Sequence, residues 1–92
     1  MTIKLYSTTS CGYCRAAKQL LSLRQLIFLE IDCSNDAATR ERLLDETGRR
    51  TVPQIYFDDV PVGGYDELVK LDRSGELAEI IAGTKKPRSV SQ

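Results

Sequence analysis

Apolar and polar residues alternate along the first third of the chain with the periods of a strand, a helix and a second strand. Residues Ile3 to Tyr6 alternate apolar and polar positions, which predicts a short strand. Ala17 and Leu21 share one face of a helix expected from about Gly12 to Leu23. The dense apolar run from Leu26 to Ile31 has the length of a strand and predicts a buried central strand.

The middle of the chain predicts a second helix. Ser34 or Asn35 can cap its start, because a short polar side chain accepts a hydrogen bond from the first free amides of a helix. The helix is expected to continue to Thr47. Gly48 then stands where helices commonly end in the left-handed conformation.

The last third of the chain predicts a β-hairpin followed by two short helices. Gln54–Phe57 and Val60–Val62 are expected to form the hairpin. Pro61 belongs on an edge strand, since proline has no amide hydrogen to donate to a neighbouring strand. Helical segments are expected over Asp66–Leu71 and Glu76–Ala82.

Taken in order, these elements predict a single α/β domain. The β-α-β half requires two parallel strands joined by a right-handed crossover, and a helix, a hairpin and the C-terminal helical region follow it. We find no internal repeat and no linker, so residues 1–82 are expected to form the domain. Residues 83–92 are polar, contain a proline and lack periodicity, which predicts a flexible tail.

Composition and charge exclude several classes of function. Thirteen basic residues balance thirteen acidic ones, so nothing indicates binding to nucleic acid or to a membrane surface. No apolar run approaches the roughly 20 residues of a membrane span. The N-terminus lacks the pattern of a secretory signal, and we expect a cytoplasmic protein. The absence of histidine excludes His-based acid–base catalysis and most zinc chemistry.

Two cysteines, Cys11 and Cys14, stand three apart where the first helix is expected to begin. A structural zinc site needs four ligands, and this pair with a distant Cys33 falls short of that number. A purely structural disulfide between them would close so small a loop that it would constrain the unfolded chain little. A Cys-X-X-Cys beside a β-α-β pattern is instead typical of a redox-active dithiol.

The helix start assigns different roles to the two thiols. The free amides and the dipole at a helix N-terminus favour negative charge, so the reactive thiolate form is favoured at Cys11. Cys14 lies one turn later on the same face, within reach of the sulfur of Cys11. We therefore expect Cys11 to attack a disulfide and Cys14 to resolve the mixed disulfide that forms.

Three motifs together resemble the glutaredoxin family: Cys11-Gly-Tyr-Cys14, Thr51-Val-Pro53 and Gly63-Gly-Tyr-Asp66. The likeness extends from about residue 2 to residue 82. It implies a thioredoxin fold with a mixed four-stranded sheet, in the order β-α-β-α-β-β-α, flanked by helices. It also implies a monomeric oxidoreductase that uses glutathione to reduce disulfide-bonded or glutathionylated proteins.

Glutathione carries a carboxylate at each end and a thiol in the middle, so its site needs a main-chain edge and a partner for each charged end. The resemblance implies a cis proline at Pro53, with the backbone of Val52 pairing with the ligand. Asp66 would hold the γ-glutamyl amino group and Arg50 the glycine carboxylate, whereas Arg49 is expected to be a solvated charge. The full set of implied glutathione-binding residues is Tyr13, Arg50, Thr51, Val52, Pro53, Gly64, Tyr65 and Asp66.

Each motif also has a purely structural interpretation that the sequence leaves open. Thr51-Val-Pro53 also suits a turn that leads into a strand, and Gly63-Gly64 suits a simple turn before a helix. Tyr13 suits a side chain that shields the helix start. Cys33 is expected to be a small buried hydrophobic residue, with glutathionylation or a regulatory disulfide as the alternative.

Two positions depart from the common family pattern. Thr8 stands where many glutaredoxins have a lysine, so Cys11 is expected to depend more on the helix terminus for its reactivity. Gly12 stands where the common dithiol form has proline. Glycine there resembles glutaredoxins that hold a [2Fe–2S] cluster between two protomers and two glutathione thiols. The alternative function is therefore a cluster-binding dimer that acts as a carrier or sensor.

Overall fold

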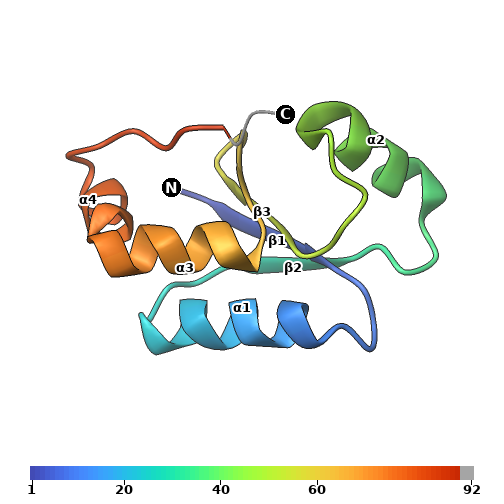
Figure 1. Cartoon of the computed structure of the whole chain (residues 1–92), viewed down its shortest axis with the longest axis horizontal. Helices are drawn as coiled ribbons and strands as arrows, with labels where there is room; N and C mark the ends of the chain where they lie inside the picture. Colours follow the sequence, from blue (N-terminus) through green and yellow to red (C-terminus); the bar gives the residue numbers. More distant parts are fainter. Residues whose placement is uncertain (90–92) are drawn as a thin grey trace.

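The computed structural model of the chain describes residues 1–89. Its elements are β1 (Ile3–Ser7), α1 (Gly12–Leu23), β2 (Leu29–Asp32), α2 (Ala37–Thr47), β3 (Gln54–Phe57), β4 (Val60–Gly63), α3 (Tyr65–Ser74) and α4 (Glu76–Ala82) (Figure 1). The expected order of strands and helices is confirmed. Helix α3 extends three residues beyond the Leu71 that the pattern predicted, because the chain first leaves the helical conformation at Gly75, where φ is 84°.

The four strands form one mixed sheet in the order β2-β1-β3-β4. Strand β1 pairs in parallel with β2 and antiparallel with β3, while β3 and β4 form the expected hairpin. Pro61 lies in β4, which is an edge strand, so this expectation is confirmed. The α/β class and the mixed four-stranded sheet are confirmed as well.

The expectation of a buried central strand over Leu26–Ile31 is wrong. Strand β2 is at the edge of the sheet, and the side chains of Ile27 and Leu29 are 92% and 58% exposed. Leu26 and Phe28, which precede the strand, pack against the main core instead. The apolar residues of this segment therefore belong largely to the connection before β2, which covers the core. Only β1 and β3 are interior strands of the sheet.

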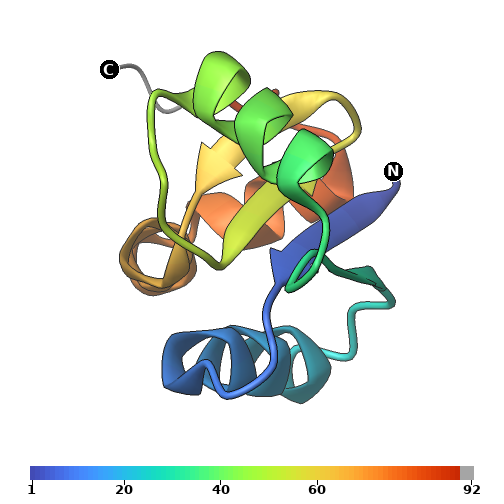
Figure 2. The same cartoon turned by 90° about the vertical axis from the view of Figure 1, so that its right-hand side faces the viewer.

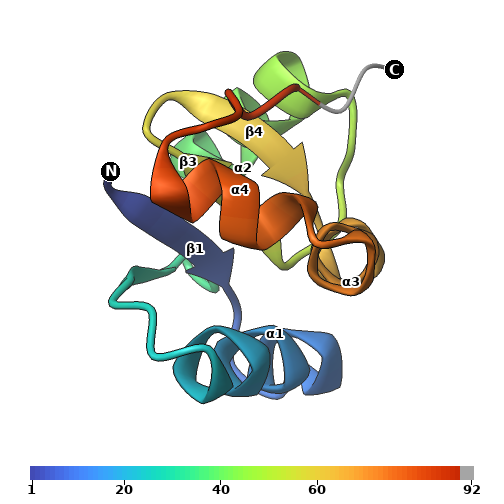
Figure 3. The ribbon, with the colours of Figure 1, turned by 90° about the vertical axis from the view of Figure 1, so that its left-hand side faces the viewer.

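Helices cover both faces of the sheet. Helices α1, α3 and α4 lie on one face and α2 lies on the other (Figures 2 and 3). The alternation of side chains along β1 and β3 separates two cores. The larger core contains Ile3, Leu5, Ala17, Leu21, Ile55, Phe57, Val62, Leu68, Leu77 and Ile80. The smaller core, under α2, contains Tyr6, Cys33, Leu43 and Tyr56.

The N-cap of the second helix lies two residues after Ser34 and one after Asn35, the two predicted caps. Asp36 is the N-cap of α2, and its carboxylate accepts from the amide of Thr39 at 3.0 Å. Ser34 instead donates its hydroxyl to Asp32 in the turn after β2, at 2.6 Å. The end of the helix is as expected, since Gly48 has the left-handed conformation with a φ of 73°.

The segment that follows α4 returns across the molecule toward β4 (Figure 3). Two of its side chains, Lys85 and Arg88, contact the carboxylate of Glu76 at 3.3 and 2.7 Å. The expected flexible tail covers residues 83–92, of which 90–92 lie outside the described residues, and the boundary at residue 82 stays a prediction. Within residues 1–89, no helix is long and apolar enough to cross a membrane.

Candidate active site

Cys11 lies at the end of the loop between β1 and α1, where it is the N-cap of α1. Its backbone is extended, with φ −106° and ψ 111°, and its sulfur accepts a hydrogen bond from the amide of Cys14 at 3.1 Å. Sulfur therefore takes the place that a Ser or Asp oxygen usually has at a helix start. A negative charge on Cys11 Sγ would be stabilised by this amide and by the helix dipole.

Cys14 has a different environment from Cys11. Its side chain is only 1% exposed, whereas that of Cys11 is half-buried. Burial, together with the hydrogen bond to Cys11, raises the pKa of the Cys14 thiol from 9.0 to about 12. All three cysteines lie within the described residues and are free thiols. At neutral pH Cys14 is therefore protonated, which fits a thiol that acts second.

The loop before β3 brings the second motif next to Cys11. The Cys11 sulfur lies 3.8 Å from the carbonyl oxygen of Val52, and the Val52–Pro53 peptide bond is cis, as the resemblance implies. The Gln54 side-chain amide donates to the carbonyl of Thr51 at 2.9 Å, which holds the loop against the start of β3. Main-chain groups of this loop are thus presented beside the thiol.

A groove of about 270 Å³ joins the three motifs. It runs between the start of α1, the loop before β3 and the start of α3, and the rings of Tyr13 and Tyr65 face each other across 6.0 Å. The groove is lined by Tyr13, Arg49, Thr51, Val52, Pro53, Gly64, Tyr65, Asp66 and Glu67. With the exception of Arg50, the side chains expected around the dithiol are therefore brought together.

The structure exchanges the expected places of two arginines. Arg50 is exposed and is not part of the groove lining, and its carbonyl accepts a hydrogen bond from Arg40. Arg49, expected to be a solvated charge, lines the groove and forms an ion pair with Glu67 at 2.8 Å. Because Arg49 directly follows the left-handed Gly48, its side chain turns toward α3.

Sequence reasoning missed Glu67. Its Oε1 accepts from the amide of Gly64 at 2.8 Å, and its two carboxylate oxygens contact the Arg49 guanidinium at 2.8 and 3.4 Å. The Arg49 guanidinium, and to a lesser extent the Gly64 amide, hold the pKa of the Glu67 carboxyl below its usual range. The signal for this residue was the spacing Gly64-X-X-Glu67, which is that of a helix-capping acid.

The two glycines before α3 allow backbone and side chains to come close to one another. Gly63 has a φ of 114°, and a Cβ there would lie 2.7 Å from the Cγ of Glu67. At Gly64 a Cβ would lie 3.1 Å from the carbonyl oxygen of Pro53. Glycine at these positions lets the start of α3 meet the loop before β3, which forms one wall of the groove.

The third cysteine lies away from the groove. Cys33 is fully buried in the smaller core, and its thiol donates to the carbonyl of Ser7 at 3.2 Å. Burial raises the pKa of the Cys33 thiol. The expectation of a small buried residue is confirmed. Among residues 1–89, no group of three or more His, Cys, Asp or Glu side chains is arranged to hold a metal ion.

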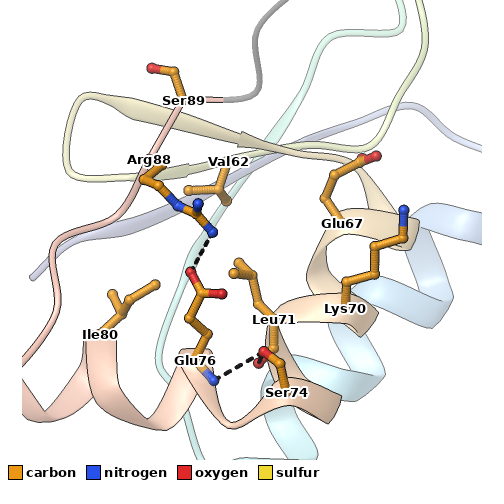
Figure 4. Close-up of a pocket in the computed structure, with 9 residues that line it drawn as sticks. All are labelled: Val62, Glu67, Lys70, Leu71, Ser74, Glu76, Ile80, Arg88 and Ser89. Atoms are coloured by element: carbon orange, nitrogen blue, oxygen red, sulfur yellow. Dashed lines mark hydrogen bonds and ion pairs between the residues drawn. The ribbon is translucent and has the colours of Figure 1, made fainter.

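A second pocket lies on the other side of Glu67, between α3, α4 and the returning C-terminal segment (Figure 4). Val62, Leu71 and Ile80 form its apolar lining, and the Glu76–Arg88 pair crosses it. The carboxylate of Glu67 is turned away from this pair. The sulfur of Cys11 lies 3.8 Å from the carbonyl of Val52, a residue of the groove, whereas this second pocket contains no residue of the Cys11 or Thr51 motifs, so the groove remains the candidate active site.

Comparisons with known proteins relate the chain to a single protein family. The family model described as Glutaredoxin matches residues 3–62. Glutaredoxin 3 of Escherichia coli strain K12 is 39% identical over 79 residues, which are 86% of this chain and 95% of that protein.

Two solved structures extend the likeness to the fold. The solution structure of a glutaredoxin from Brucella melitensis is 35% identical with a TM-score of 0.82, and the match covers 92% of each chain. The crystal structure of a buckwheat glutaredoxin–glutathione complex is 28% identical with a TM-score of 0.82, over 89% of this chain and 77% of that one.

Proposed function

The chain belongs to the glutaredoxin family and has the thioredoxin fold, and from this premise we propose that it is a glutathione-dependent thiol–disulfide oxidoreductase. Membership of the family supports thiol–disulfide exchange in general. The finer proposal is that the dithiol reduces protein–glutathione mixed disulfides and protein disulfides with electrons from glutathione. The observation that carries it is the half-buried Cys11 sulfur, which accepts from a helix amide and lies 3.8 Å from Val52 in the motif that lines the groove.

In the first proposed route, Cys11 alone forms bonds to sulfur. Its thiolate attacks the glutathione sulfur of a mixed disulfide, a new sulfur–sulfur bond forms at Cys11, and the bond to the protein substrate breaks. The substrate leaves as a thiolate and takes up a proton from water. A second glutathione thiolate then attacks the glutathione on Cys11, which releases glutathione disulfide and restores the Cys11 thiolate.

The second route uses both cysteines on a protein disulfide. Cys11 attacks one sulfur of the substrate and remains joined to it. Cys14 gives its proton to the substrate thiolate released by the first attack and then attacks the sulfur of Cys11. The second substrate sulfur leaves as a thiolate that takes up a proton from water, and a Cys11–Cys14 disulfide forms. Two glutathione molecules then reduce that disulfide. The burial of Cys14 and its raised pKa support its role as the second nucleophile rather than the first.

The groove offers a partner for each part of glutathione. We propose that the Val52 backbone pairs with the cysteine of the ligand and that Asp66 accepts from its γ-glutamyl amino group. Arg49, in place of Arg50, would bind the glycine carboxylate, since it is the arginine that lines the groove. Tyr13 and Tyr65, whose ring centroids are 6.0 Å apart, would together form one wall against the ligand. The buckwheat glutaredoxin of the same fold was solved as a complex with glutathione, which supports glutathione as the ligand.

Replacement of the two cysteines tests the scheme. Cys11→Ser should abolish both routes, because no other accessible thiol lies beside the groove among residues 1–89. Cys14→Ser should keep reduction of a glutathionylated peptide within about twofold while it abolishes reduction of a protein disulfide. Coupled assays with the two substrates measure both activities, and equal losses in the Cys14 variant would contradict the proposed division of labour.

The cluster-binding alternative stays a prediction. Within residues 1–89 one chain offers a single accessible cysteine sulfur at the groove, because Cys14 is only 1% exposed. A [2Fe–2S] cluster would therefore need its other ligands from a second chain and from glutathione. Freshly purified protein that is brown, dimeric and retains glutathione would favour the cluster, whereas a colourless active monomer would favour the reductase.

A further inference from the structure

Glu67 occupies a position in the groove that the proposed activity does not use. Its side chain is 25% exposed and that of Arg49 is 35% exposed, and both line the groove. The two terminal guanidinium nitrogens of Arg49, Nη1 and Nη2, donate to the carboxylate at 2.8 and 3.4 Å. A paired arrangement of this kind is how an arginine binds the carboxylate of a ligand. Two donors of the groove arginine are thus already occupied by a carboxylate of the protein itself.

The same carboxylate also accepts a hydrogen bond from the main chain. Glu67 Oε1 accepts from the amide of Gly64, at the start of α3, where free amides and the helix dipole favour an anion. Two donors that suit a ligand carboxylate, one guanidinium and one amide, therefore converge on Glu67. Its side chain resembles the end of a bound peptide more than it resembles an ordinary surface acid.

The neighbourhood holds Glu67 in this place. Gly63 leaves room for its side chain, since a Cβ on Gly63 would overlap the Cβ and Cγ of Glu67 at 2.8 and 2.7 Å. The nearby cation Arg88 is engaged by Glu76 at 2.7 Å, and Figure 4 shows Glu67 turned away from that pair. The partner of Glu67 is therefore Arg49, on the groove side.

We propose that Glu67 is a specificity-determining residue that competes with the glycine-end carboxylate of glutathione for Arg49. This inference rests on the proposed function, because it concerns the affinity of the same groove. When the ligand binds, its carboxylate competes with Glu67 for the edge of the guanidinium formed by Nη1 and Nη2. Glu67 therefore weakens the binding of glutathione and speeds its release, and it leaves ligands without that carboxylate unaffected.

A supporting role for Glu67 would have the opposite consequence. If the acid only oriented Arg49 toward the ligand, loss of its charge would release the arginine into solvent and weaken binding. Competition predicts that loss of the charge strengthens binding. The sign of a single substitution thus separates the two roles.

The test compares Glu67→Gln with a matched control, Glu79→Gln. Glutamine keeps an oxygen that accepts from the Gly64 amide, so the start of α3 is preserved while the charge opposite Arg49 is lost. Glu79 is exposed on α4 and gives the same change in net charge. The probes are S-methylglutathione, which cannot react, and its glycine ethyl ester, which lacks the contested carboxylate. Binding is measured by titration calorimetry or NMR.

Glu67→Gln should bind S-methylglutathione about tenfold more tightly and the ester within twofold of the unaltered protein, because a freed charge-assisted contact is worth about this factor. Glu79→Gln should change neither affinity. Unchanged or weaker binding of the acid by Glu67→Gln, or equal tightening of the ester, would overturn the inference. Failure of the unaltered protein to bind either probe would instead overturn the proposed function, and the inference with it.

A second variant keeps the test independent of any effect on folding. Arg49→Gln removes the contested cation, so in that background Glu67→Gln should no longer tighten the binding of S-methylglutathione. A tenfold gain that persists without Arg49 would show that Glu67 does not act through this arginine and would refute the competition.

Discussion

At the scale of single residues, the two cysteines of the groove differ in burial and in hydrogen bonding. Cys11 Sγ accepts the amide of Cys14, while the Cys14 side chain is almost completely enclosed, and burial raises its pKa to about 12. The order of attack in the proposed cycle follows from this difference. In that proposed cycle a substrate disulfide would react with Cys11 first, and Cys14 would react only after a mixed disulfide has formed next to it.

Thr8 permits a prediction at this scale. Thr8→Lys places a positive charge three residues before Cys11, which should favour the thiolate and raise the rate of iodoacetamide alkylation at pH 6 by about threefold. Rates measured from pH 4 to pH 9 give the midpoint of the titration, which should move to lower pH.

The control for this change is Thr84→Lys, which adds the same charge at an exposed position beyond α4. Salt screens charges that are far apart in solvent, so this variant should leave the alkylation profile unaltered. A midpoint that stays in place in Thr8→Lys would refute the idea that position 8 tunes the nucleophile.

Sequence reasoning found most of the candidate site because each motif belongs to one short segment. Cys11 is predicted from the local Cys-X-X-Cys spacing, Val52 and Gly64 from the resemblance of their motifs to the family, and the structure brings these segments together. Sequence reasoning places Arg50 rather than Arg49 at the groove because the two arginines are adjacent, and only the backbone turn after α2 decides which one lines it. Glu67 was missed because its role depends on Arg49, 18 residues away in the chain.

At the scale of elements, the groove depends on how closely α3 approaches the loop before β3. Gly63 and Gly64 end β4 and start the helix, and both stand where a side chain would crowd a neighbour. Gly75 and Gly83 end α3 and α4 with φ values of 84° in open space. These glycines share a backbone preference but differ in packing, so their substitution separates the two effects.

We expect Gly63→Ala to lower the free energy of unfolding by about 3 kcal/mol, since it combines an unfavourable positive φ with an overlap at 2.7 Å. Gly75→Ala, with a φ of 84° and nothing within 4 Å of the added Cβ, should cost only about 1 kcal/mol. Urea denaturation with an unchanged m-value measures both. Equal losses would mean that crowding against Glu67 contributes nothing.

Most elements were predictable because their period and end signals agree. The alternation in β1, the stop at Gly48 and the proline on edge strand β4 each have a local cause. The position of β2 had no local signal, because the apolar run before it packs on the core from a connecting segment. The cap of α2 was placed too early because Ser34 and Asp36 are equally good caps, and the turn after β2 takes the serine.

At the scale of the whole molecule, ionisable groups should confine stability to a window of pH. Interaction with Lys18, Arg49 and Arg24 lowers the pKa values of Glu30, Glu67 and Asp72 from their ordinary values of 4.5, 4.5 and 3.8. A lowered carboxyl pKa stabilises the fold above the ordinary value, and this stability is lost as the pH falls through the lowered value.

At alkaline pH the sign of the effect is reversed. Burial raises the pKa values of the Cys14 thiol and the Tyr56 hydroxyl, so above about pH 9 the unfolded chain ionises first and stability falls. With no histidine in the chain, we expect the thermal unfolding midpoint to be flat from about pH 5 to pH 8 and to decline on both sides. Circular dichroism melts across this range test the plateau, and a marked step near pH 6.5 would argue against it.

The interior position of β1 has a consequence for the synthesis of the protein. β1 leaves the ribosome before the other elements of this domain, yet its antiparallel neighbour β3 begins only at Gln54, and the wall of the groove that contains Gly64 follows later. A nascent chain that ends before β3 lacks half of the sheet, including Tyr56, which packs with Cys33 in the smaller core. Emergence of the second half of the chain therefore completes the burial of the Cys33 thiol, while Cys11 stays partly exposed.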